Sequence, residues 1–122
     1  MRKKILLVED EKIFCNLVID ILDDYDVFIA LDGIYGLKIG KLQKPDLIIL
    51  DLSLPRMDGE EMLRRFREDD ALKAIPVVLI SGTFTSAHTG ERIEEYPAEA
   101  VFSKPLDIDK FREKIRSLLP AQ

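Results

Sequence analysis

The sequence predicts an α/β fold: a doubly wound, five-stranded parallel sheet with helices on both faces. Five short apolar runs have the near-continuous hydrophobicity of strands buried on both sides, and they lie at residues 5–8, 27–30, 47–50, 77–80 and 100–102. Stretches with apolar residues at helical spacing follow these runs, so strands and helices alternate, as crossovers between parallel strands require. The chain has 122 residues, of which 47% are hydrophobic, which is enough for one domain with one core.

The first half of the chain contains two strand–helix units. The first strand ends on the three acids at 9–11, and a helix is predicted from about residue 11 to 23 by the spacing of Ile13, Phe14, Leu17, Val18, Ile21 and Leu22. Cys15 lies beside this apolar face, and we expect it to pack in the core. The second strand leads into a turn at Asp32-Gly33 and a helix with two interior glycines, which lower its propensity. We expect the core-facing residues of that helix to be Ile34, Leu37 and Leu42.

The second half repeats the pattern less regularly. The central strand leads to Asp51 and then to Pro55, which cannot continue a central ladder. Asp58-Gly59 marks a turn, with Asp58 as the N-cap of a third helix. The pattern is poor from residue 83 to 97, where we expect a short fourth helix around residues 91–95 that is mobile or irregular, because few apolar residues anchor it. The last helix is predicted by the spacing of Ile108, Phe111, Ile115 and Leu118.

Composition and charge exclude several classes of protein. The 23 acidic and 18 basic residues give a formal net charge of −5, which argues against nucleic-acid binding by this domain. The chain has no apolar run long enough to span a membrane, and its first residues lack the apolar stretch of a secretory signal. Its single cysteine excludes an internal disulfide and suits a reducing compartment. We therefore expect a cytoplasmic protein without a membrane partner.

Polar side chains stand where the predicted strands end. Glu9 and Asp10 follow the first strand, Asp51 ends the third, Ser81 ends the fourth and Lys104 follows the fifth. In a parallel sheet these strand ends lie at one edge, which is where ligands bind in open α/β sheets. We therefore expect these side chains to line one crevice, although they are far apart in the sequence.

Such a group of residues suits phosphoryl transfer onto Asp51. Carboxylates that are crowded together repel one another when ionised, and a hard divalent cation relieves the repulsion; ligands that are all oxygen atoms favour Mg²⁺. Lys104 offers a positive charge to Asp51 or to an incoming phosphoryl group, and Ser81 offers a hydroxyl donor. With a carboxylate as nucleophile, catalysis consists mostly of positioning and charge stabilisation.

Each residue also has an ordinary explanation. Asp51 could only cap the next turn, the acids at 9–11 could only begin a helix, Lys104 could be a surface lysine and Ser81 an ordinary strand-end residue. We expect His88, the single histidine, to be solvated in a polar loop rather than catalytic. For the site to be absent, all of these ordinary explanations would have to be true at once, for residues that all stand at the same ends of the predicted strands. This coincidence favours a functional site.

Four segments carry a resemblance to a known family. They are ILLVEDE at 5–11, PDLIILDLSLPRMDG at 45–59, PVVLISG at 76–82 and SKP at 103–105. In this order and spacing they resemble a bacterial two-component response-regulator receiver domain of the CheY-like type. The resemblance covers essentially the whole chain and implies the flavodoxin-like (βα)5 fold with strand order 2-1-3-4-5. We expect a single receiver domain over residues 1–122, with no effector domain after the last helix.

The resemblance implies roles for the acids of the predicted crevice. Asp51 would be the phosphoacceptor. Asp10, with Glu9 beside it, would hold Mg²⁺ together with the Asp51 carboxylate and the backbone carbonyl of Ser53. The phosphoryl group would come from a phosphohistidine on a sensor histidine kinase or a histidine phosphotransfer protein.

The resemblance also implies a conformational output. Ser81 would occupy the family's Ser/Thr switch position, and Lys104 the position of its lysine. The phosphoryl group would draw in Ser81 and alter the face of the fourth helix, fifth strand and last helix, which would bind a downstream effector protein or domain, or form a phosphorylation-dependent dimer. The family usually carries an aromatic residue three positions before the lysine, where this chain has Val101. Phe102 is adjacent, but strand alternation should point it to the opposite face.

The predicted function is a signalling module that promotes only its own phosphorylation and dephosphorylation, rather than an enzyme with a separate substrate. Two alternatives remain. A small phosphohydrolase with an aspartyl-phosphate intermediate would need a second acid two residues after the nucleophile, where this chain has Ser53. A receiver-like scaffold that no longer responds to phosphate gains slight support from Val101, whereas the acids, Ser81 and Lys104 oppose it.

Overall fold

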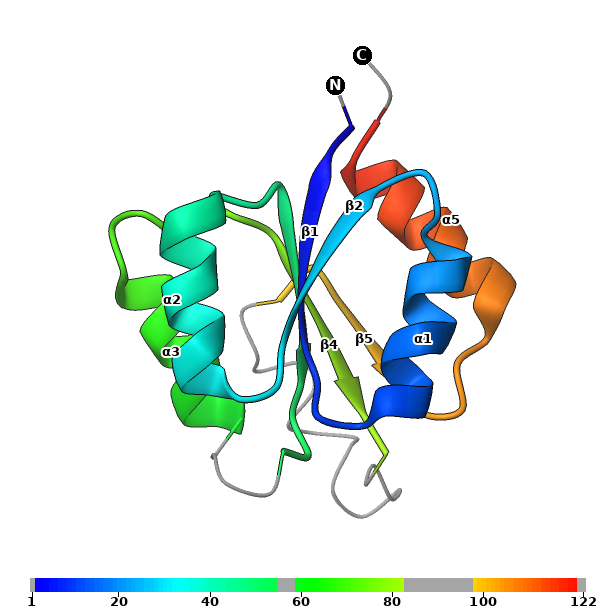
Figure 1. Cartoon of the computed structure of the whole chain (residues 1–122), viewed down its shortest axis with the longest axis horizontal. Helices are drawn as coiled ribbons and strands as arrows, with labels where there is room; N and C mark the ends of the chain where they lie inside the picture. The colour runs from blue at the N-terminus through cyan, green and yellow to red at the C-terminus, as the bar shows by residue number, and fades with distance from the viewer. Residues whose placement is uncertain (1, 55–58, 83–97, 121–122) are drawn as a thin grey trace.

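The computed structural model describes residues 2–54, 59–82 and 98–120, which form a sheet between two layers of helices (Figure 1). The strands are β1 (Lys4–Val8), β2 (Asp26–Ala30), β3 (Leu47–Asp51), β4 (Val77–Ser81) and β5 (Ala100–Ser103). The described helices are α1 (Lys12–Ile21), α2 (Gly33–Gln43), α3 (Gly59–Glu68) and α5 (Ile108–Leu118). None of these helices is long and apolar enough to cross a lipid bilayer. The predicted N-cap Asp58 and the predicted fourth helix at 91–95 lie outside the described residues.

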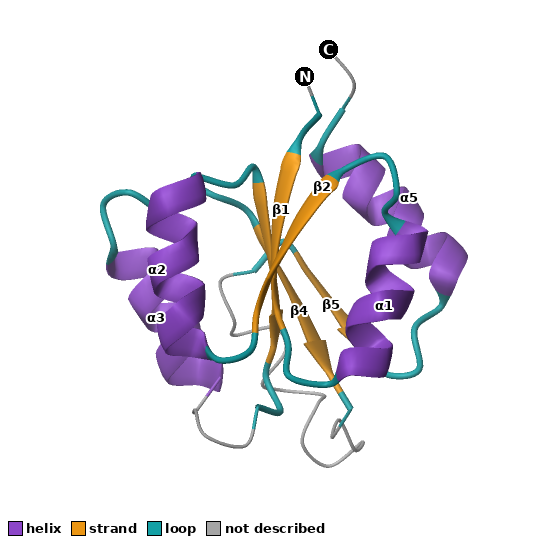
Figure 2. Ribbon diagram, in the orientation of Figure 1, coloured by secondary structure: helices purple, strands orange, loops and turns teal. Residues whose placement is uncertain are grey.

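All five strands are parallel and lie in the order β2-β1-β3-β4-β5. This confirms the predicted five-stranded parallel sheet and the flavodoxin-like strand order. Helices α2 and α3 cover one face of the sheet, and α1 and α5 cover the other (Figure 2). β1 and β3 are neighbours, but the helices that follow them lie on opposite faces. The edge of the sheet outside their carboxyl ends is therefore the switch point at which such sheets bind ligands.

Two apolar layers, one on each side of the sheet, form the core. β1 contributes to both: Ile5 and Leu7 pack on the side of α1 and α5, whereas Leu6 and Val8 pack on the side of α2 and α3. Every residue of β3 and β4 is buried. A strand that is covered on both faces has no polar side to show, which explains the continuous apolar runs in the sequence.

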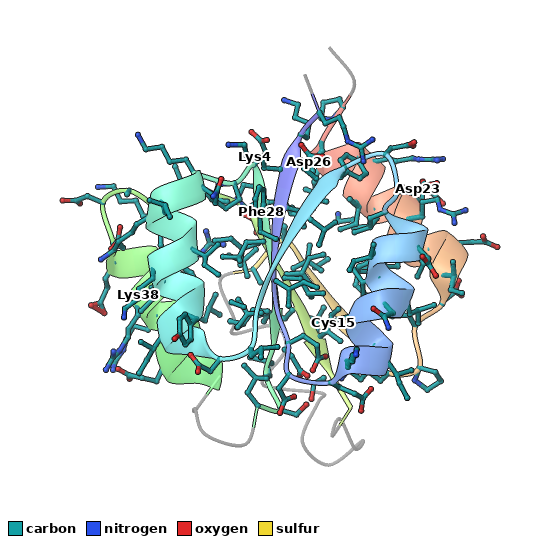
Figure 3. The ribbon with its side chains drawn as sticks, in the orientation of Figure 1. Lys4, Cys15, Asp23, Asp26, Phe28 and Lys38 are labelled. Atoms are coloured by element: carbon teal, nitrogen blue, oxygen red, sulfur yellow. The ribbon has the colours of Figure 1, made fainter. Side chains whose placement is uncertain are left out.

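Helix α1 buries a narrower face than its apolar spacing predicts. The buried residues are Phe14, Cys15, Val18 and Ile21. Cys15 faces the sheet (Figure 3), which confirms that it packs in the core. Ile13 and Leu17, which we counted in the apolar pattern, are instead 81% and 36% exposed. Each precedes a buried residue by one position, and a helical step of about 100° turns it out of the buried stripe.

Helix α2 packs on the sheet through a different face from the one that we predicted. Its three glycines take the buried positions, whereas Ile34 and Leu42 are 55% and 79% exposed. Leu37 packs at the edge of the core and is only partly buried. The physical reason is the close approach of the helix to the sheet, because a Cβ atom on Gly36 would lie only 2.9 Å from Cγ2 of Val8. The prediction that Ile34 and Leu42 face the core was therefore wrong.

Alanine at Gly36 is expected to lower the free energy of unfolding by about 1 kcal/mol in urea titrations. Alanine is the better helix former by about 1 kcal/mol, but overpacking costs about 1–3 kcal/mol. The new Cβ would meet Val8, a buried β-branched residue that has little freedom to move. Gly40→Ala is the matched control, because its Cβ would meet the flexible end of Leu72, with Cδ2 at 3.2 Å. Equal stabilisation of both variants would contradict the close approach at Gly36.

Two residues of β5 face opposite sides of the sheet. Phe102 packs on the side of α1 and α5, edge-on to Phe111, with 5.3 Å between the ring centroids. Val101 packs on the side of α2 and α3. This confirms that Phe102 points away from the face on which Val101 lies, so it does not supply an aromatic ring there.

Candidate functional site

The sheet brings the predicted site residues to one edge. Glu9 directly follows β1, Asp51 and Ser81 are the last residues of β3 and β4, and Lys104 directly follows β5. Backbone hydrogen bonds continue the ladders here. The amide of Glu9 donates to the carbonyl of Ala30 (2.9 Å), and the amide of Lys104 donates to the carbonyl of Ser81 (3.0 Å). The backbone at this edge is therefore fixed by the neighbouring strands.

Lys104 joins two carboxylates from different strands. Its Nζ lies 2.7 Å from Oε1 of Glu9 and 3.1 Å from Oδ2 of Asp51. The Glu9 side chain is fully buried and that of Lys104 is 19% exposed, so solvent ions screen these pairs weakly. Partial burial acts to lower the pKa of Lys104, but its hydrogen bonds to Glu9 and Asp51 outweigh that effect and raise the pKa. The ammonium therefore stays charged beside Asp51.

Glu9 is buried more deeply than its place at the start of a loop suggests. Its second oxygen, Oε2, accepts hydrogen bonds from the backbone amides of Asp10 (2.9 Å) and Glu11 (3.0 Å), which closes the turn between β1 and α1. Burial raises the pKa of Glu9 to about 7; its hydrogen bond with Asp51 adds to this effect and Lys104 opposes it. Near neutral pH, this carboxyl group therefore exchanges between protonated and ionised forms.

Asp51 is held as a carboxylate. Its Oδ1 accepts hydrogen bonds from the backbone amide (2.8 Å) and the hydroxyl (2.6 Å) of Ser53, and its Oδ2 accepts one from Lys104. Burial acts to raise the pKa of Asp51, but the hydrogen bonds with Glu9 and Ser53 and the charge of Lys104 lower it below its usual value. An ionised oxygen at this position has the charge that a nucleophile requires.

Phe14 also contacts the site, although its spacing in the sequence indicated only a core residue. Nζ of Lys104 lies 4.2 Å from the centroid of its ring, within the range of a cation–π interaction. The ring is 6% exposed and belongs to the apolar layer beneath α1 and α5. A sequence signal was available, because Phe14 lies in the first turn of the helix that follows Glu9 and Asp10.

Three carboxylates at this edge fit a cation. One oxygen from each of Glu9, Asp10 and Asp51 lies within 4.8 Å of the other two. Asp10 is exposed whereas Glu9 and Asp51 are buried, so one side of the group is open to water. A donor set made only of oxygen atoms, with room for waters, suits a hard divalent cation such as Mg²⁺.

Ser81 lies at the same edge, between the two strands that carry the charged groups. β4 pairs with β3 through Ile80 and Asp51, and with β5 through Ser81 and Ser103. Ser81 is buried and directly follows the residue opposite Asp51. The structure therefore brings together the acids, the serine and the lysine that the sequence placed at strand ends.

The sequence matches the family model of the response regulator receiver domain over residues 5–116. The chain belongs to this family. Receiver domains are signalling modules of two-component systems, and the matched residues run from β1 into α5. Glu9, Asp51 and Lys104 thus lie together at the carboxyl-end edge of the sheet of a receiver domain.

Similar proteins and solved structures agree with this assignment. The polar-differentiation response regulator DivK of Brucella anthropi is 32% identical over 121 residues, which cover 98% of each chain. The signal receiver domain of a DNA-binding response regulator (merR) from Colwellia psychrerythraea is 27% identical, with a TM-score of 0.84 over 98% of this chain and 99% of that one. The Mn²⁺-bound form of response regulator Rcp1 is 30% identical, with a TM-score of 0.75 over 98% and 97% of the two chains.

Proposed function

We propose that this receiver domain accepts a phosphoryl group on Asp51 and uses it to change a partner-binding surface. The observation that carries the proposal is the position of Asp51, a buried carboxylate that accepts hydrogen bonds from the hydroxyl of Ser53 and the ammonium of Lys104. Membership of the receiver family supports the same conclusion. The phosphoryl donor is a phosphohistidine on a sensor histidine kinase or a histidine phosphotransfer protein.

The transfer forms one bond at phosphorus and breaks another. An oxygen of the Asp51 carboxylate attacks phosphorus while the P–N bond of the phosphohistidine breaks, and the electron pair of that bond stays on the imidazole nitrogen. Lys104, already 3.1 Å from Asp51, meets the charge of the incoming phosphoryl oxygens. In hydrolysis, water attacks phosphorus, the electron pair of the P–O bond returns to Asp51, and inorganic phosphate and a proton leave.

Mg²⁺ is the metal that we propose for this site. Glu9, Asp10 and the Asp51 carboxylate, with the backbone carbonyl of Ser53, would hold it, and when bound it would neutralise charge on the phosphoryl group. The grouping of the three carboxylates within 4.8 Å supports this proposal. A Mn²⁺-bound form of the relative Rcp1 supports a divalent cation in the family.

The phosphoryl group acts by adding charge and acceptor oxygens at the end of the sheet. Ser81 donates its hydroxyl to one of these oxygens, which pulls on the end of β4. The neighbouring β5 and α5 then change the face that meets a downstream effector or a second copy. Because Val101 stands at the family's aromatic position, no ring rotation at that residue carries the change.

This role is signalling rather than turnover of a separate substrate. The net charge of −5 supports a domain that does not itself bind nucleic acid. The single cysteine, Cys15, is free and buried, which supports a cytoplasmic setting. Sustained hydrolysis of an added phosphomonoester that is lost in Asp51→Asn would overturn the proposal in favour of a phosphohydrolase.

Intact-mass measurement tests the proposed function. Incubation with acetyl phosphate and Mg²⁺ is expected to add one phosphoryl group, which is lost on treatment with base. Asp51→Asn and removal of the metal with a chelator should each abolish the adduct, because one removes the nucleophile and the other the counter-charge. Asp46→Asn, at an exposed carboxylate before β3, is the matched control and should label normally. Rapid hydrolysis of the adduct is excluded with beryllofluoride, a stable mimic of the phosphoryl group. Failure of the folded protein both to label and to bind this mimic would overturn the proposal.

A further inference from the structure

We propose that Phe14 is a positioning residue for Lys104, and that its ring keeps the ammonium directed at Asp51 during phosphoryl transfer. This inference rests on the proposed function of Asp51 as phosphoacceptor. Phe14 acts only through the lysine and is not proposed to contact Asp51 or the phosphoryl donor.

Three side chains contact the ammonium of Lys104. Glu9 lies 2.7 Å away, Asp51 lies 3.1 Å away, and the centroid of the Phe14 ring lies 4.2 Å away. Glu9 and Asp51 each accept a hydrogen bond from the ammonium, which has three N–H donors, whereas the ring attracts the charge through its face and takes none of the hydrogen bonds. The ring therefore leaves the donors free to turn towards the two carboxylates.

The ring is a fixed support, because it is part of the core. Phe14 is 6% exposed and packs in the apolar layer with Val18 of the next turn of α1. Lys104, by contrast, reaches the site on a flexible chain of four methylenes. Among the described residues, the aromatic ring that contacts the Lys104 ammonium belongs to Phe14. Without the ring, water could enter on that side and the lysine would lose one of its three constraints.

The ring matters most when Asp51 changes charge. Formation of the acyl phosphate removes the negative charge of the Asp51 carboxylate that attracts Lys104, while Glu9 continues to attract it. The contact with Phe14 does not depend on the state of Asp51, so it persists through the transfer. It therefore limits movement of the ammonium when the Asp51 charge is lost and keeps it within reach of the phosphoryl oxygens.

The test compares phosphorylation rates with acetyl phosphate and saturating Mg²⁺ in four proteins. These are wild type, Phe14→Leu, Lys104→Met and the double variant. Phe14→Leu is expected to slow the rate about tenfold. In the Lys104→Met background, Phe14→Leu should cause no further loss, because there is no ammonium left to position. A merely structural role would slow both backgrounds by the same factor and would overturn the proposal.

Two further variants separate positioning from packing. Phe14→Tyr keeps a ring and is expected to retain most of the rate. Phe111→Leu removes a ring from the same apolar layer, where Phe111 contacts Phe102, and should leave the rate unchanged. A rate in Phe14→Leu equal to that of wild type would overturn this inference alone. A wild-type protein that neither forms an Asp51 adduct nor binds beryllofluoride would overturn the proposed function, and this inference with it.

Discussion

Lys104→Met is expected to slow phosphoryl uptake by Asp51 about 100-fold, the loss that follows removal of one preorganised charge-stabilising donor. Methionine keeps an unbranched chain of similar length, so packing on Phe14 is largely retained and the ammonium is lost. The same change also leaves Glu9 and Asp51 without their shared cation. Breaking a buried ion pair in this way costs about 3 kcal/mol in the free energy of unfolding.

The rate is measured by time-resolved intact mass with acetyl phosphate, and stability by urea titration. Lys110→Met, at an exposed lysine of α5, is the matched control and should change neither quantity. The loss of stability in Lys104→Met should be larger at pH 8 than at pH 5, because Glu9 is protonated at the lower pH and then needs no cation. An undiminished phosphorylation rate would contradict the role proposed for Lys104.

Glu9→Gln is expected to remove a fall in stability that the wild-type protein shows as pH rises from about 5 to about 7. Burial raises the pKa of Glu9 from 4.5 to about 7 on folding. Between these values the folded protein binds the proton more tightly than the unfolded chain, so raising the pH favours unfolding. A shift of this size corresponds to about 3 kcal/mol at most. Glutamine resembles the protonated form and does not titrate.

Urea titrations at intervals from pH 5 to pH 8, with a chelator present, measure this difference. Asp51 changes the stability in the opposite direction as pH rises and in a different pH range, because its pKa is lowered on folding. The stability it provides is present above its unfolded pKa and is lost only as pH falls through its lower folded pKa, below the range for Glu9. Glu11→Gln, at an exposed acid of the same turn, is the control. Parallel curves for wild type and Glu9→Gln would show that Glu9 does not titrate in this range.

The sheet and the composition of the site could be predicted because both depend on rules of position. Strands that are buried on both faces must be continuously apolar, and β1, β3 and β4 could be predicted from their apolar runs for this reason. Parallel strands end at one edge, so Asp51, Ser81 and Lys104 had to lie near one another once the strands were assigned. Neither rule depends on knowing how any side chain packs.

The rest depended on distances between elements, which a pattern of apolar residues does not encode. Helix α2 approaches β1 so closely that Gly36 faces Val8, and its larger residues turn outwards. The depth of Glu9 follows from its hydrogen bonds to two backbone amides, which form only when the turn into α1 is closed. The contact of Phe14 with Lys104 joins residues that are ninety positions apart.

The direction of the strands also determines where a label, a resin or a fused protein can be attached without blocking the site. β1 begins and α5 ends at the edge of the sheet opposite the site, and Lys4 and Asp26 lie near that edge (Figures 1 and 3). A strand of five residues separates the two edges, a length of about 16 Å. A dye, a resin or a fused protein joined near Lys4 or after α5 would therefore leave the approach to Asp51 open. Immobilised protein should be phosphorylated by acetyl phosphate as fast as protein free in solution.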